Sequence, residues 1–447
     1  MFLAVCVTLM FGYPVAFTLA GTALIFAGVG IATGHFNANL LLAYPERVFG
    51  TISNTTLIAV PLFIFMGVVL ERSKVAEELL ENMSHACSKL PAGLGLSVVI
   101  VGAMLAASTG IVGATVVTMG LISLPTMLKR GYSPSLAAGT ICATGTLGQI
   151  IPPSIALVLL GDIIASAYQQ AQLNQGIYNA VPISVGDLFM GAIGPGLLLV
   201  VLYLLYLTGV GLLSPKQAPP VADDEHVPYW QLIRSIFPPL LLIILVLGSI
   251  ISGAATPTEA AGVGAIAALA LAFFKGKLSV EILRGVVEST TNVTAMVFAI
   301  LLGASLFSLA FHGFGGEQMI EQIFSALPGG KYSALLLVML LIFLLGFILD
   351  FIEITFVVVP LVGPVLLQMG FDPIWLGIMI AINLQTSFLT PPFGFALFYL
   401  RGVAHEQLTT TAIYRGVVPF IVIQLTVLLL LTIFPSIATW LPYSLKP

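Results

Sequence analysis

The chain has 447 residues, of which 59% are hydrophobic and only 8% are charged. A soluble domain carries about 25% charged residues, so this composition, with a mean hydropathy of +1.11, excludes a cytosolic enzyme and a disordered chain. A total of 15 Lys and Arg against 19 Asp and Glu gives a net charge of -4, which argues against a nucleic-acid-binding protein. Apolar runs of about 20 residues recur from end to end. We therefore predict an all-α polytopic membrane protein embedded in a lipid bilayer.

The first part of the chain is predicted to contain two helices, an amphipathic helix and a re-entrant hairpin. The helices are expected at 2–31 and 56–71, and the amphipathic helix at 71–89. The N-terminus lacks a basic region and a cleavage site, so the first run is expected to be a retained helix and not a signal peptide. Two apolar pieces follow at 93–107 and 113–128. Each is only about 23 Å long, too short for about 30 Å of hydrocarbon, which favours a hairpin with a small polar tip.

The rest of the chain repeats this order after a set of longer helices. The predicted elements are an interrupted helix at 134–167, helices at 184–212, 230–252, 256–275 and 285–311, an amphipathic helix at 313–326, short apolar pieces at 331–348 and 354–369, an interrupted helix at 373–404 and a last helix at 411–434. A hydrophilic linker at 214–229 divides the chain near its middle. The second pair of short pieces predicts a second re-entrant hairpin.

An internal repeat with a spacing of 239 residues relates the two parts. The matching positions are Gly131 with Gly370, Pro134 with Pro373, Thr144 with Asn383, and Pro152-Pro153 with Pro391-Pro392. Chance explains one such match, but several in one register, with matching hydropathy between them, indicate a duplication.

Positive residues predict the orientation of the repeats. Those around the first hairpin are Arg72, Lys74, Lys89, Lys129 and Arg130, whereas Lys331 stands alone beside the second. Because cytoplasmic loops carry an excess of Lys and Arg, the first hairpin is expected to enter from the cytoplasm and the second from the periplasm. An odd number of predicted crossings between the hairpins also inverts the second repeat. We predict two inverted repeats, with the N-terminus in the cytoplasm and the C-terminus in the periplasm.

Inverted repeats with broken helices are typical of secondary transporters, whose sites lie near the bilayer midplane. Carbonyls upstream of a Pro-Pro break lose their amide donors, and with nearby hydroxyls they form an all-oxygen cage for a monovalent cation. Helix N-termini at the hairpin tips favour an anion. The candidate Na+ ligands are Ser108, Gly110, Thr144, Gly145, Thr146, Pro152, Asp350, Asn383, Thr386 and Thr390. The candidate substrate-binding residues are Ser108, Thr109, Gly110, Ser154, Glu353, Phe393 and Gly394.

Each candidate also has a purely structural interpretation. Gly, Ser and Thr allow transmembrane helices to pack closely, and the aromatic residues near Phe393 are typical of helix packing. Intramembrane carboxylates such as Asp350 and Glu353 are functional candidates, but they can also cap a hairpin helix. The cysteines are far apart in sequence and are expected to be free and buried: Cys6, Cys87 and Cys142.

An ordered series of motifs resembles the large membrane subunit of tripartite ATP-independent periplasmic (TRAP) transporters over essentially the whole chain. The motifs are PLFIFMG at 61–67, KRGY at 129–132, GTLG at 145–148, IPPS at 151–154, TPTEAA at 256–261, GFDP at 370–373, NL at 383–384 and TPP at 390–392. The resemblance implies a Na+-coupled importer of organic acids, with an elevator-type moving domain, in the bacterial inner membrane. It also implies two partners, a separate small four-helix membrane subunit and a periplasmic substrate-binding protein. Because the first hydrophobic run already matches the start of the large subunit, no fused small-subunit segment is expected.

The resemblance and the repeat together predict a division of the chain. The predicted parts are scaffold helices and a first arm at 1–89, a first transport repeat at 90–167, further scaffold helices with the cytoplasmic linker and a second arm at 168–326, a second transport repeat at 327–404 and a C-terminal scaffold helix at 405–447.

A stand-alone Na+/dicarboxylate symporter without a binding protein is the alternative within transport. An intramembrane aspartyl protease places its two carboxylates on separate helices, which the acidic pair Asp350 and Glu353 does not match. A channel needs no duplicated, occluding hairpins.

Overall fold

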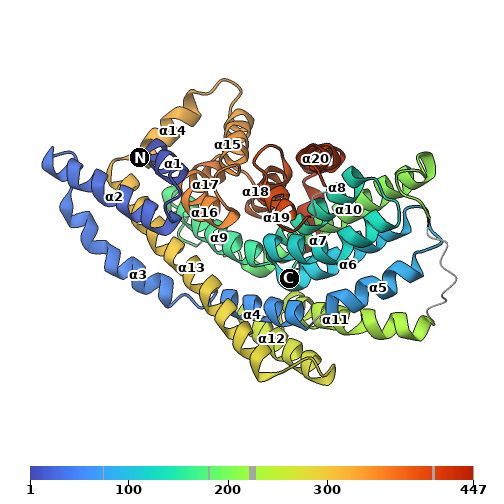
Figure 1. The fold of residues 1–447 in the computed structure, drawn as a ribbon. Helices are drawn as coiled ribbons and strands as arrows, with labels where there is room; N and C mark the ends of the chain where they lie inside the picture. Colours follow the sequence, from blue (N-terminus) through green and yellow to red (C-terminus); the bar gives the residue numbers. More distant parts are fainter. Residues whose placement is uncertain (74, 180–181, 221–227, 405–407, 446–447) are drawn as a thin grey trace.

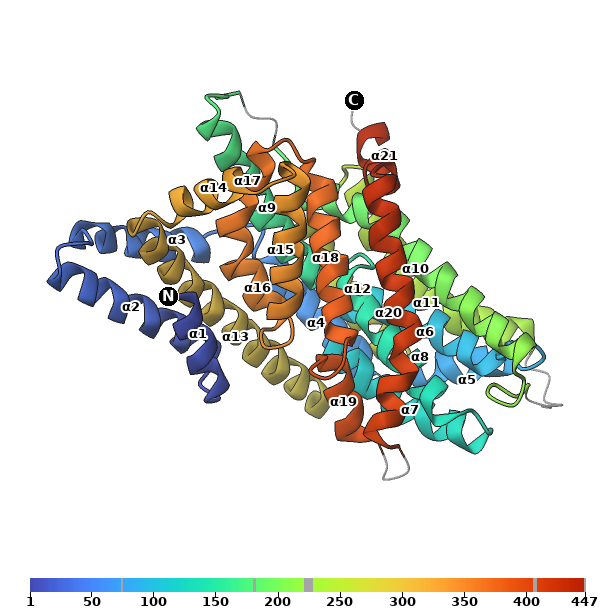
Figure 2. The ribbon, with the colours of Figure 1, turned by 90° about the horizontal axis from the view of Figure 1, so that it is seen from above.

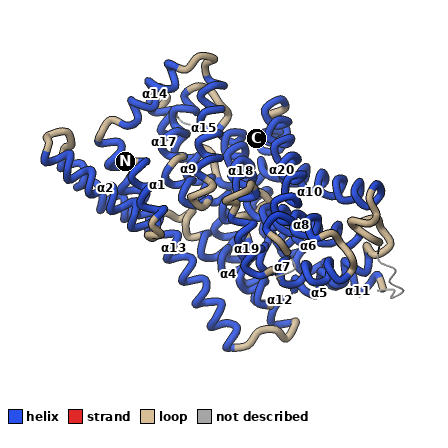
Figure 3. The backbone as a smooth tube through the Cα atoms, turned by 45° about the horizontal axis from the view of Figure 1, so that its top comes forward, coloured by secondary structure: helices blue, strands red, loops and turns tan. Residues whose placement is uncertain are grey.

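The structure is a computed structural model of the chain. It describes all residues except 74, 180–181, 221–227, 405–407 and 446–447. The side chains at 75, 76, 108, 109 and 229 are also not described. Within these residues every regular element is a helix (Figure 3). Seven helices are long and apolar enough to cross a bilayer, and a bent pair raises the number to as many as eight. The prediction of an all-α multi-pass membrane protein is therefore confirmed. Residues 221–227 of the predicted linker at 214–229 lie outside the described residues.

The helices form two layers, which Figure 1 shows one above the other. The lower one, which we call the support layer, contains α2 (Val15–Ala32), α3 (Tyr44–Ile52), α4 (Ala59–Arg72), α5 (Val75–Ala86), α11 (Tyr229–Ile251), α12 (Pro257–Phe274) and α13 (Val280–Gly313). α13 packs along α2 and α4, and α12 packs along α4 and α11. A short helix, α1 (Phe2–Met10), packs on α2, and the 3-10 helix η1 (Ala38–Ala43) precedes α3.

The upper layer, which we call the hairpin layer, holds both hairpins and both broken helices. Its members are α6 (Gly93–Thr109), α7 (Val112–Lys129), α8 (Pro134–Thr146), η2 (Leu147–Gln149), α9 (Ile155–Asn174), α10 (Val185–Leu213), α15 (Lys331–Leu345), α16 (Phe351–Val357), α17 (Val359–Gln368), α18 (Pro373–Leu389), α19 (Phe395–Val403) and α20 (Thr410–Ile433). α20 packs against α8 and α18, and α10 packs against α6, α9, α18 and α20. The division into scaffold and transport parts stays a prediction, but the packing places α10 and α20 among the hairpins rather than in the support layer.

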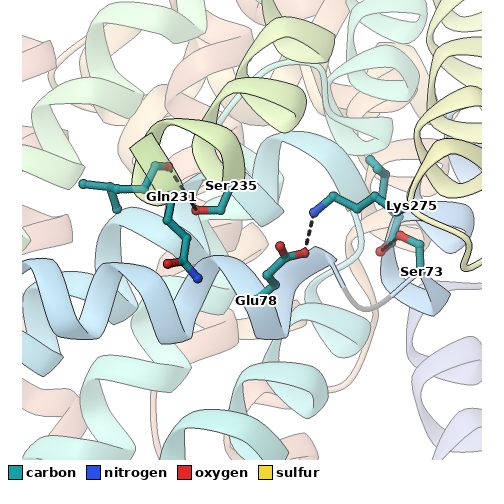
Figure 4. Close-up of polar contacts among 7 residues, drawn as sticks. Ser73, Glu78, Gln231, Ser235 and Lys275 are labelled. Atoms are coloured by element: carbon teal, nitrogen blue, oxygen red, sulfur yellow. Dashed lines mark hydrogen bonds and ion pairs between the residues drawn. The ribbon is translucent and has the colours of Figure 1, made fainter. Parts of the chain in front are cut away.

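Two amphipathic helices connect the layers at corresponding points of the two halves. α5 contacts α6 of the first hairpin, and α14 (Gly316–Ala326) contacts both α13 and α17. Within the support layer, α5 is linked to α12, because Lys275 Nζ at the end of α12 lies 2.5 Å from Glu78 Oε2 (Figure 4). Since Glu78 is 54% exposed, the ion pair contributes only about 0–1 kcal/mol. Apolar packing must therefore supply most of the attachment.

The same local geometry recurs 239 residues later in the chain. Gly131 and Gly370 both have positive φ, +81° and +84°, a conformation that glycine adopts without steric cost. Ser133 and Asp372 then cap α8 and α18, each accepting a hydrogen bond from the backbone N–H three residues later, at 3.2 and 2.8 Å. Both helices begin with a proline, which suits the first turn because it needs no N–H there. The two halves therefore share the backbone geometry that their repeated residues predict.

The single helix predicted at 2–31 is wrong, because this run forms two helices. α1 ends at Met10 and α2 begins at Val15. Gly12 has a φ of +81°, which ends a right-handed helix, and Pro14 precedes α2 in an extended conformation. Proline lacks the N–H that would continue the helical ladder.

The predicted piece at 354–369 is also interrupted. α16 and α17 meet at Val358 with a bend of 57°. Pro360 in the first turn of α17 has no N–H to donate to the preceding helix. The chain also continues beyond the last predicted helix into α21 (Ser436–Leu445), which packs against α10.

The first hairpin has a tighter tip than predicted. Only Gly110 and Ile111 separate α6 from α7, so the expected tip at 108–113 shrinks to two residues. α7 has 18 residues and is long and apolar enough to cross a bilayer, which makes it longer than the predicted piece. The two helices nevertheless pack side by side as a hairpin.

Candidate functional site

A cavity of about 170 Å³ lies where the two hairpin tips meet the first break. We call it the central cavity. Its lining residues come from both layers and are Ile64, Gly110, Ile111, Val112, Gly113, Gln149, Ile155, Ala156, Val293, Met296, Val297, Asp350, Phe351, Ile352, Phe388 and Tyr399. The cavity brings together both hairpin tips and the first break, which are three elements of the sequence repeat. α4 and α13 of the support layer close it from the other side.

The first tip is built around a glycine that no other residue replaces without strain. Gly110 has a φ of +63° and ends α6, with its N–H donating to Ala106 O at 3.1 Å. A Cβ added at Gly110 would lie only 3.0 Å from Ile155 N at the start of α9. The tip therefore rests directly on the first break. The side chains of Ser108 and Thr109, both predicted site residues, lie outside the described part of the structure.

The first break separates α8 from α9, and its Pro152–Pro153 peptide bond is cis. Ser154 caps α9, and its hydroxyl donates to Gly148 O at 2.8 Å, one of the carbonyls near the break. Ser154 is fully buried and does not line the central cavity, so its geometry is that of a helix cap. Gln149 does line the cavity, and its buried Oε1 has no hydrogen-bond partner within the described residues. This amide oxygen is free to accept a bond from a ligand or to bind a cation.

Thr144 and Thr146 lie on different faces of α8. The methyl group of Thr144 packs against Gly102, and its buried Oγ1 has no partner within the described residues. Thr146 Oγ1 donates to Ala143 O at 2.8 Å and lies 3.3 Å from Gln385 Nε2. The Thr144 hydroxyl is thus available to an ion, whereas the Thr146 hydroxyl is already hydrogen-bonded.

The contact of Thr146 with Gln385 joins residues that are 239 positions apart. These are equivalent positions of the two repeats in the sequence, and they meet where α8 packs against α18. Gln424 Nε2 completes the cluster, donating to Tyr203 Oη at 2.9 Å and lying 3.4 Å from Thr146 Oγ1. The four side chains are fully buried and link both broken helices to α10 and α20.

Gly145 and Pro152 are the remaining candidates of the first repeat. A Cβ at Gly145 would lie 2.2 Å from Val116 Cγ2, so this glycine permits close packing of α8 on α7. Pro152 is buried in the break. Neither side chain lines the central cavity.

The second tip begins with a capping box, in which two side chains satisfy each other's backbone amides. Asp350 Oδ1 accepts from Phe351 N at 2.7 Å, and Glu353 Oε2 accepts from Asp350 N at 2.9 Å. Such a cap satisfies N–H groups that a helix start leaves unpaired. Asp350 also lines the central cavity, whereas Glu353 is 92% buried and does not. The geometry therefore gives Glu353 a capping role and leaves Asp350 with both interpretations.

The candidates at the second break are bonded to their own hairpin and helix. Asn383 Nδ2 donates to Met339 O at 2.8 Å. Thr386 and Thr390 each donate to the carbonyl four residues earlier, at 2.8 and 2.7 Å. None of the three lines the cavity that Asp350 lines. That Asp350 and these residues hold a cation stays a prediction, although Asp350 lines this cavity together with the first tip and they do not.

Phe393 and Gly394 lie outside the central cavity. Phe393 is 54% exposed and its ring lies 6.4 Å from that of Phe347. Gly394 begins α19, and its N–H donates to Thr390 O at 3.0 Å. The aromatic residues on either side of the second break that do line the central cavity are Phe388 and Tyr399.

Sequence reasoning missed several lining residues. Gln149 and Phe388 both line the cavity and are 239 positions apart. They are therefore equivalent positions of the sequence repeat, and this equivalence could have identified them as candidates. Val293, Met296 and Val297 carry no such signal, because nothing in their apolar helix distinguishes the face that meets the hairpins.

The central cavity has a simple charge distribution. Among the described residues that line it, Asp350 alone is charged, and no Lys or Arg is present. Within the described part of the chain no three His, Cys, Asp or Glu residues come together as a transition-metal site. The oxygens of Asp350 and Gln149 instead suit a hard cation such as Na+.

Comparison with known proteins identifies a family. Residues 2–437 match the family described as "Tripartite ATP-independent periplasmic transporter, DctM component". A C4-dicarboxylate TRAP transporter large permease of Vibrio cholerae is 29% identical, covering 99% of this chain and 96% of that protein. One of Rhodobacter capsulatus is 30% identical over 89% of both chains. An ectoine TRAP transporter large permease of Halomonas elongata is 27% identical, covering 97% of this chain and 96% of that protein.

Solved structures share the fold. The Alcanivorax borkumensis YdaH transporter superposes with a TM-score of 0.63 at 14% identity, covering 99% of this chain and 100% of that one. At this identity the likeness concerns the fold alone.

Proposed function

The chain belongs to the DctM-component family of tripartite ATP-independent periplasmic transporters, and we propose that it imports an organic acid in symport with Na+. It is a large permease subunit for an organic solute, with many membrane spans, and not an enzyme. The relatives named for C4-dicarboxylates and for ectoine transport different compounds, which share a carboxylate. A carboxylic acid is therefore the substrate class that we propose.

The observation that supports Na+ coupling is the isolated carboxylate of Asp350 in the central cavity. A carboxylate substrate entering this cavity would meet a like charge and no positive side chain. Charges of the same sign at close range in a medium of low dielectric repel strongly. A bound cation removes this repulsion, so substrate binding requires the cation.

The residues that would hold Na+ are those with free oxygens near the first break. They are Asp350 and the side-chain oxygens of Gln149 and Thr144. Backbone carbonyls of the break, several of which already accept one hydrogen bond, would add a second lone pair each. When bound, Na+ supplies one positive charge at the hairpin tips. The substrate carboxylate would then lie against the backbone amides at the start of α7, where the helix dipole also favours an anion.

The layer arrangement supports an elevator mechanism with inverted repeats. The hairpin layer carries both tips and both breaks, and α10 and α20 pack within it. The support layer contributes only apolar residues to the central cavity, namely Ile64, Val293, Met296 and Val297. At the central cavity, therefore, no polar bond must break when the hairpin layer slides past the support layer. Away from this cavity, the contacts of Asn54 with Asp162 and of Thr118 with Glu71 would have to break. In this proposal α10 and α20 move with the hairpins.

The proposed assembly contains two further components, a small four-helix membrane subunit and a periplasmic binding protein that delivers the substrate. A tripartite family supports this composition. The support layer exposes large apolar side chains on α2 and α11, such as Phe17, Ile25 and Phe237, which suit lipid or a membrane subunit.

We expect uptake by proteoliposomes that hold all three components to require Na+. The measurement is uptake of radiolabelled succinate, followed by other organic acids, with Na+ present or replaced by choline. Uptake that continues unchanged in choline would contradict the symport proposal. Equal uptake without the binding protein would instead favour a stand-alone symporter.

Labelling of single cysteines should show the proposed orientation in the bacterial inner membrane. After Cys6, Cys87 and Cys142, all free thiols, are replaced by alanine, Lys129→Cys should react only from the cytoplasm and Asn174→Cys only from the periplasm. The reason is that α8 and α9 lie between these positions and the proline break does not reverse the chain (Figure 2). Reaction of both cysteines from one side would contradict the inverted-repeat topology.

A further inference from the structure

A second cavity, of about 340 Å³, lies on the side of the central cavity toward the base of the second hairpin. We call it the distal cavity. Its walls come from α3 and the turn after it, α9, α13 and the second hairpin, and the polar side chains among them are Arg47, Thr51, Asn54, Asp162, Ser305 and Ser308. Three of its walls, α9, α13 and the second hairpin, also line the central cavity.

The two cavities follow one another along the same helices. On α9 the lining moves from Ile155 at the central cavity to Asp162 at the distal one, and on α13 it moves from Val297 to Ala304. Each step is seven residues, about 10 Å along a helix. The distal cavity therefore lies about two helical turns beyond the central one, between the two layers. In the proposed orientation this is the periplasmic side, from which substrate arrives.

Two opposite charges line the distal cavity without pairing. Asn54 Nδ2 lies 3.2 Å from both carboxylate oxygens of Asp162 and holds that group in place. Arg47 makes no side-chain hydrogen bond or ion pair with any described residue, and no oxygen of Asp162 lies within 4.0 Å of it. The N–H donors of the planar Arg47 guanidinium are therefore available to a ligand in the same cavity.

The position of Arg47 is fixed by its own short helix. Tyr44 Oη donates to Leu302 O on α13 at 3.1 Å and ties the start of α3 to one wall of the cavity. Thr51 Oγ1 donates to Arg47 O at 2.9 Å one turn later. The backbone that carries Arg47 is thus held against α13, while the guanidinium itself is unpaired.

We infer that the distal cavity is an entry site that binds the carboxylate of an organic acid through Arg47, before the acid reaches the central cavity. Guanidinium and carboxylate pair through two parallel hydrogen bonds. The Asp162 carboxylate can accept hydrogen bonds from hydroxyl or ammonium groups of the same ligand. The hydroxyls of Ser305 and Ser308 can rotate and donate further hydrogen bonds to it. The site rests on the proposed function for its substrate class, but it is formed by different residues from those of the central cavity.

The test uses thiol protection, which requires no transport. In the chain with its three native cysteines replaced, Ser308→Cys is modified with an anionic or a cationic methanethiosulfonate, with succinate or acetate present or absent. Acetate carries only the carboxylate that the site is proposed to bind. We expect the anionic reagent to react faster, and both acids to slow the reaction. Failure of both acids to protect Cys at this position would overturn the inference.

Variants at Arg47 then identify the group responsible. Arg47→Gln should lower the preference for the anionic reagent by about tenfold and abolish protection, and Arg47→Lys should retain much of both. Lys331→Gln is the matched control, because it removes one positive charge at the same end of the second hairpin but outside the cavity, and should change neither. Protection that persists in a folded Arg47→Gln variant would overturn the inference.

Uptake by the complete transporter separates this site from the proposed function. If the Ser308→Cys chain shows protection at the distal cavity but wild-type proteoliposomes show no Na+-dependent uptake, the symport proposal fails and the entry site stands. If Na+-dependent uptake is normal and Arg47→Gln changes neither protection nor uptake at limiting substrate, the entry site fails and the symport proposal stands.

Discussion

Replacing Gly139 or Gly416 by alanine is expected to destabilise the protein strongly, because each added methyl group would force apart two helices of the hairpin layer. A Cβ at Gly139 would lie 2.0 Å from Gly416 O, where α8 crosses α20. A Cβ at Gly416 would lie 1.9 Å from Ser135 O on α8. Both obstacles are backbone atoms, so no side-chain rotation relieves the overlap and the two helices must separate. Overpacking typically costs about 1–3 kcal/mol, and an overlap with backbone atoms places these variants toward the upper end of that range.

The measurement is thermal unfolding in detergent, followed by size-exclusion fluorescence, for Gly139→Ala and Gly416→Ala. Gly209→Ala on α10 is the control, because a Cβ there meets no atom within 4 Å. Alanine favours a helix over glycine by about 1 kcal/mol, so the control should be neutral or slightly stabilising. An unchanged melting temperature for Gly139→Ala would show that α8 and α20 are not in close contact.

This contact bears on which helices move together. Small residues at Ser135, Gly139 and Gly416 bring the two backbones together, as in close transmembrane helix pairs. Helices in such contact cannot slide past each other without first separating. We therefore propose that α20 moves together with the first broken helix. The sequence had predicted that this helix belongs to the scaffold.

Local features of the site were predictable from sequence because they depend on a few neighbouring residues. A Pro-Pro dipeptide removes two backbone donors from a helix, and both breaks were expected at the repeated dipeptides Pro152-Pro153 and Pro391-Pro392. The dipeptide alone does not decide the outcome, because α11 continues through Pro238-Pro239. Likewise, Asp350 followed by Glu353 three residues later satisfies the pattern of a capping box, which the structure contains. The spacing of 239 residues predicted that the two sets of elements correspond.

Tertiary neighbours were not predictable in this way. Asn383 and Thr390 carry the residue types of a cation site, but their side chains are already hydrogen-bonded to nearby backbone carbonyls. Whether a hydroxyl is free depends on which carbonyl packs next to it, and no local pattern contains that information. The same holds for Arg47 and Asp162, which are 115 positions apart in sequence and share a cavity only after α3 and α9 have packed.

The conservative substitution Asp350→Asn is expected to weaken Na+ coupling while leaving the fold intact. Asparagine caps a helix about as well as aspartate, so the hydrogen bond from Phe351 N to this side chain is retained. The charge, however, is lost from a cavity in which it is the only charge among the described lining residues. Hydrogen bonds and contacts to a charged group contribute about 1.5–3 kcal/mol. The Na+ concentration for half-maximal uptake should therefore rise by about 10- to 100-fold.

Two further variants separate charge from capping. Asp350→Ala removes both, so it should lower thermal stability by about 1 kcal/mol in addition to the change in Na+ dependence. Asp372→Asn is the matched control, because Asp372 caps α18 through Trp375 N at 2.8 Å and does not line the central cavity. It should leave Na+ dependence unchanged. If Asp350→Asn instead transports with the Na+ dependence of the wild type, Asp350 acts only as a helix cap. The cation must then be held by the carbonyls and side-chain oxygens of the first break alone.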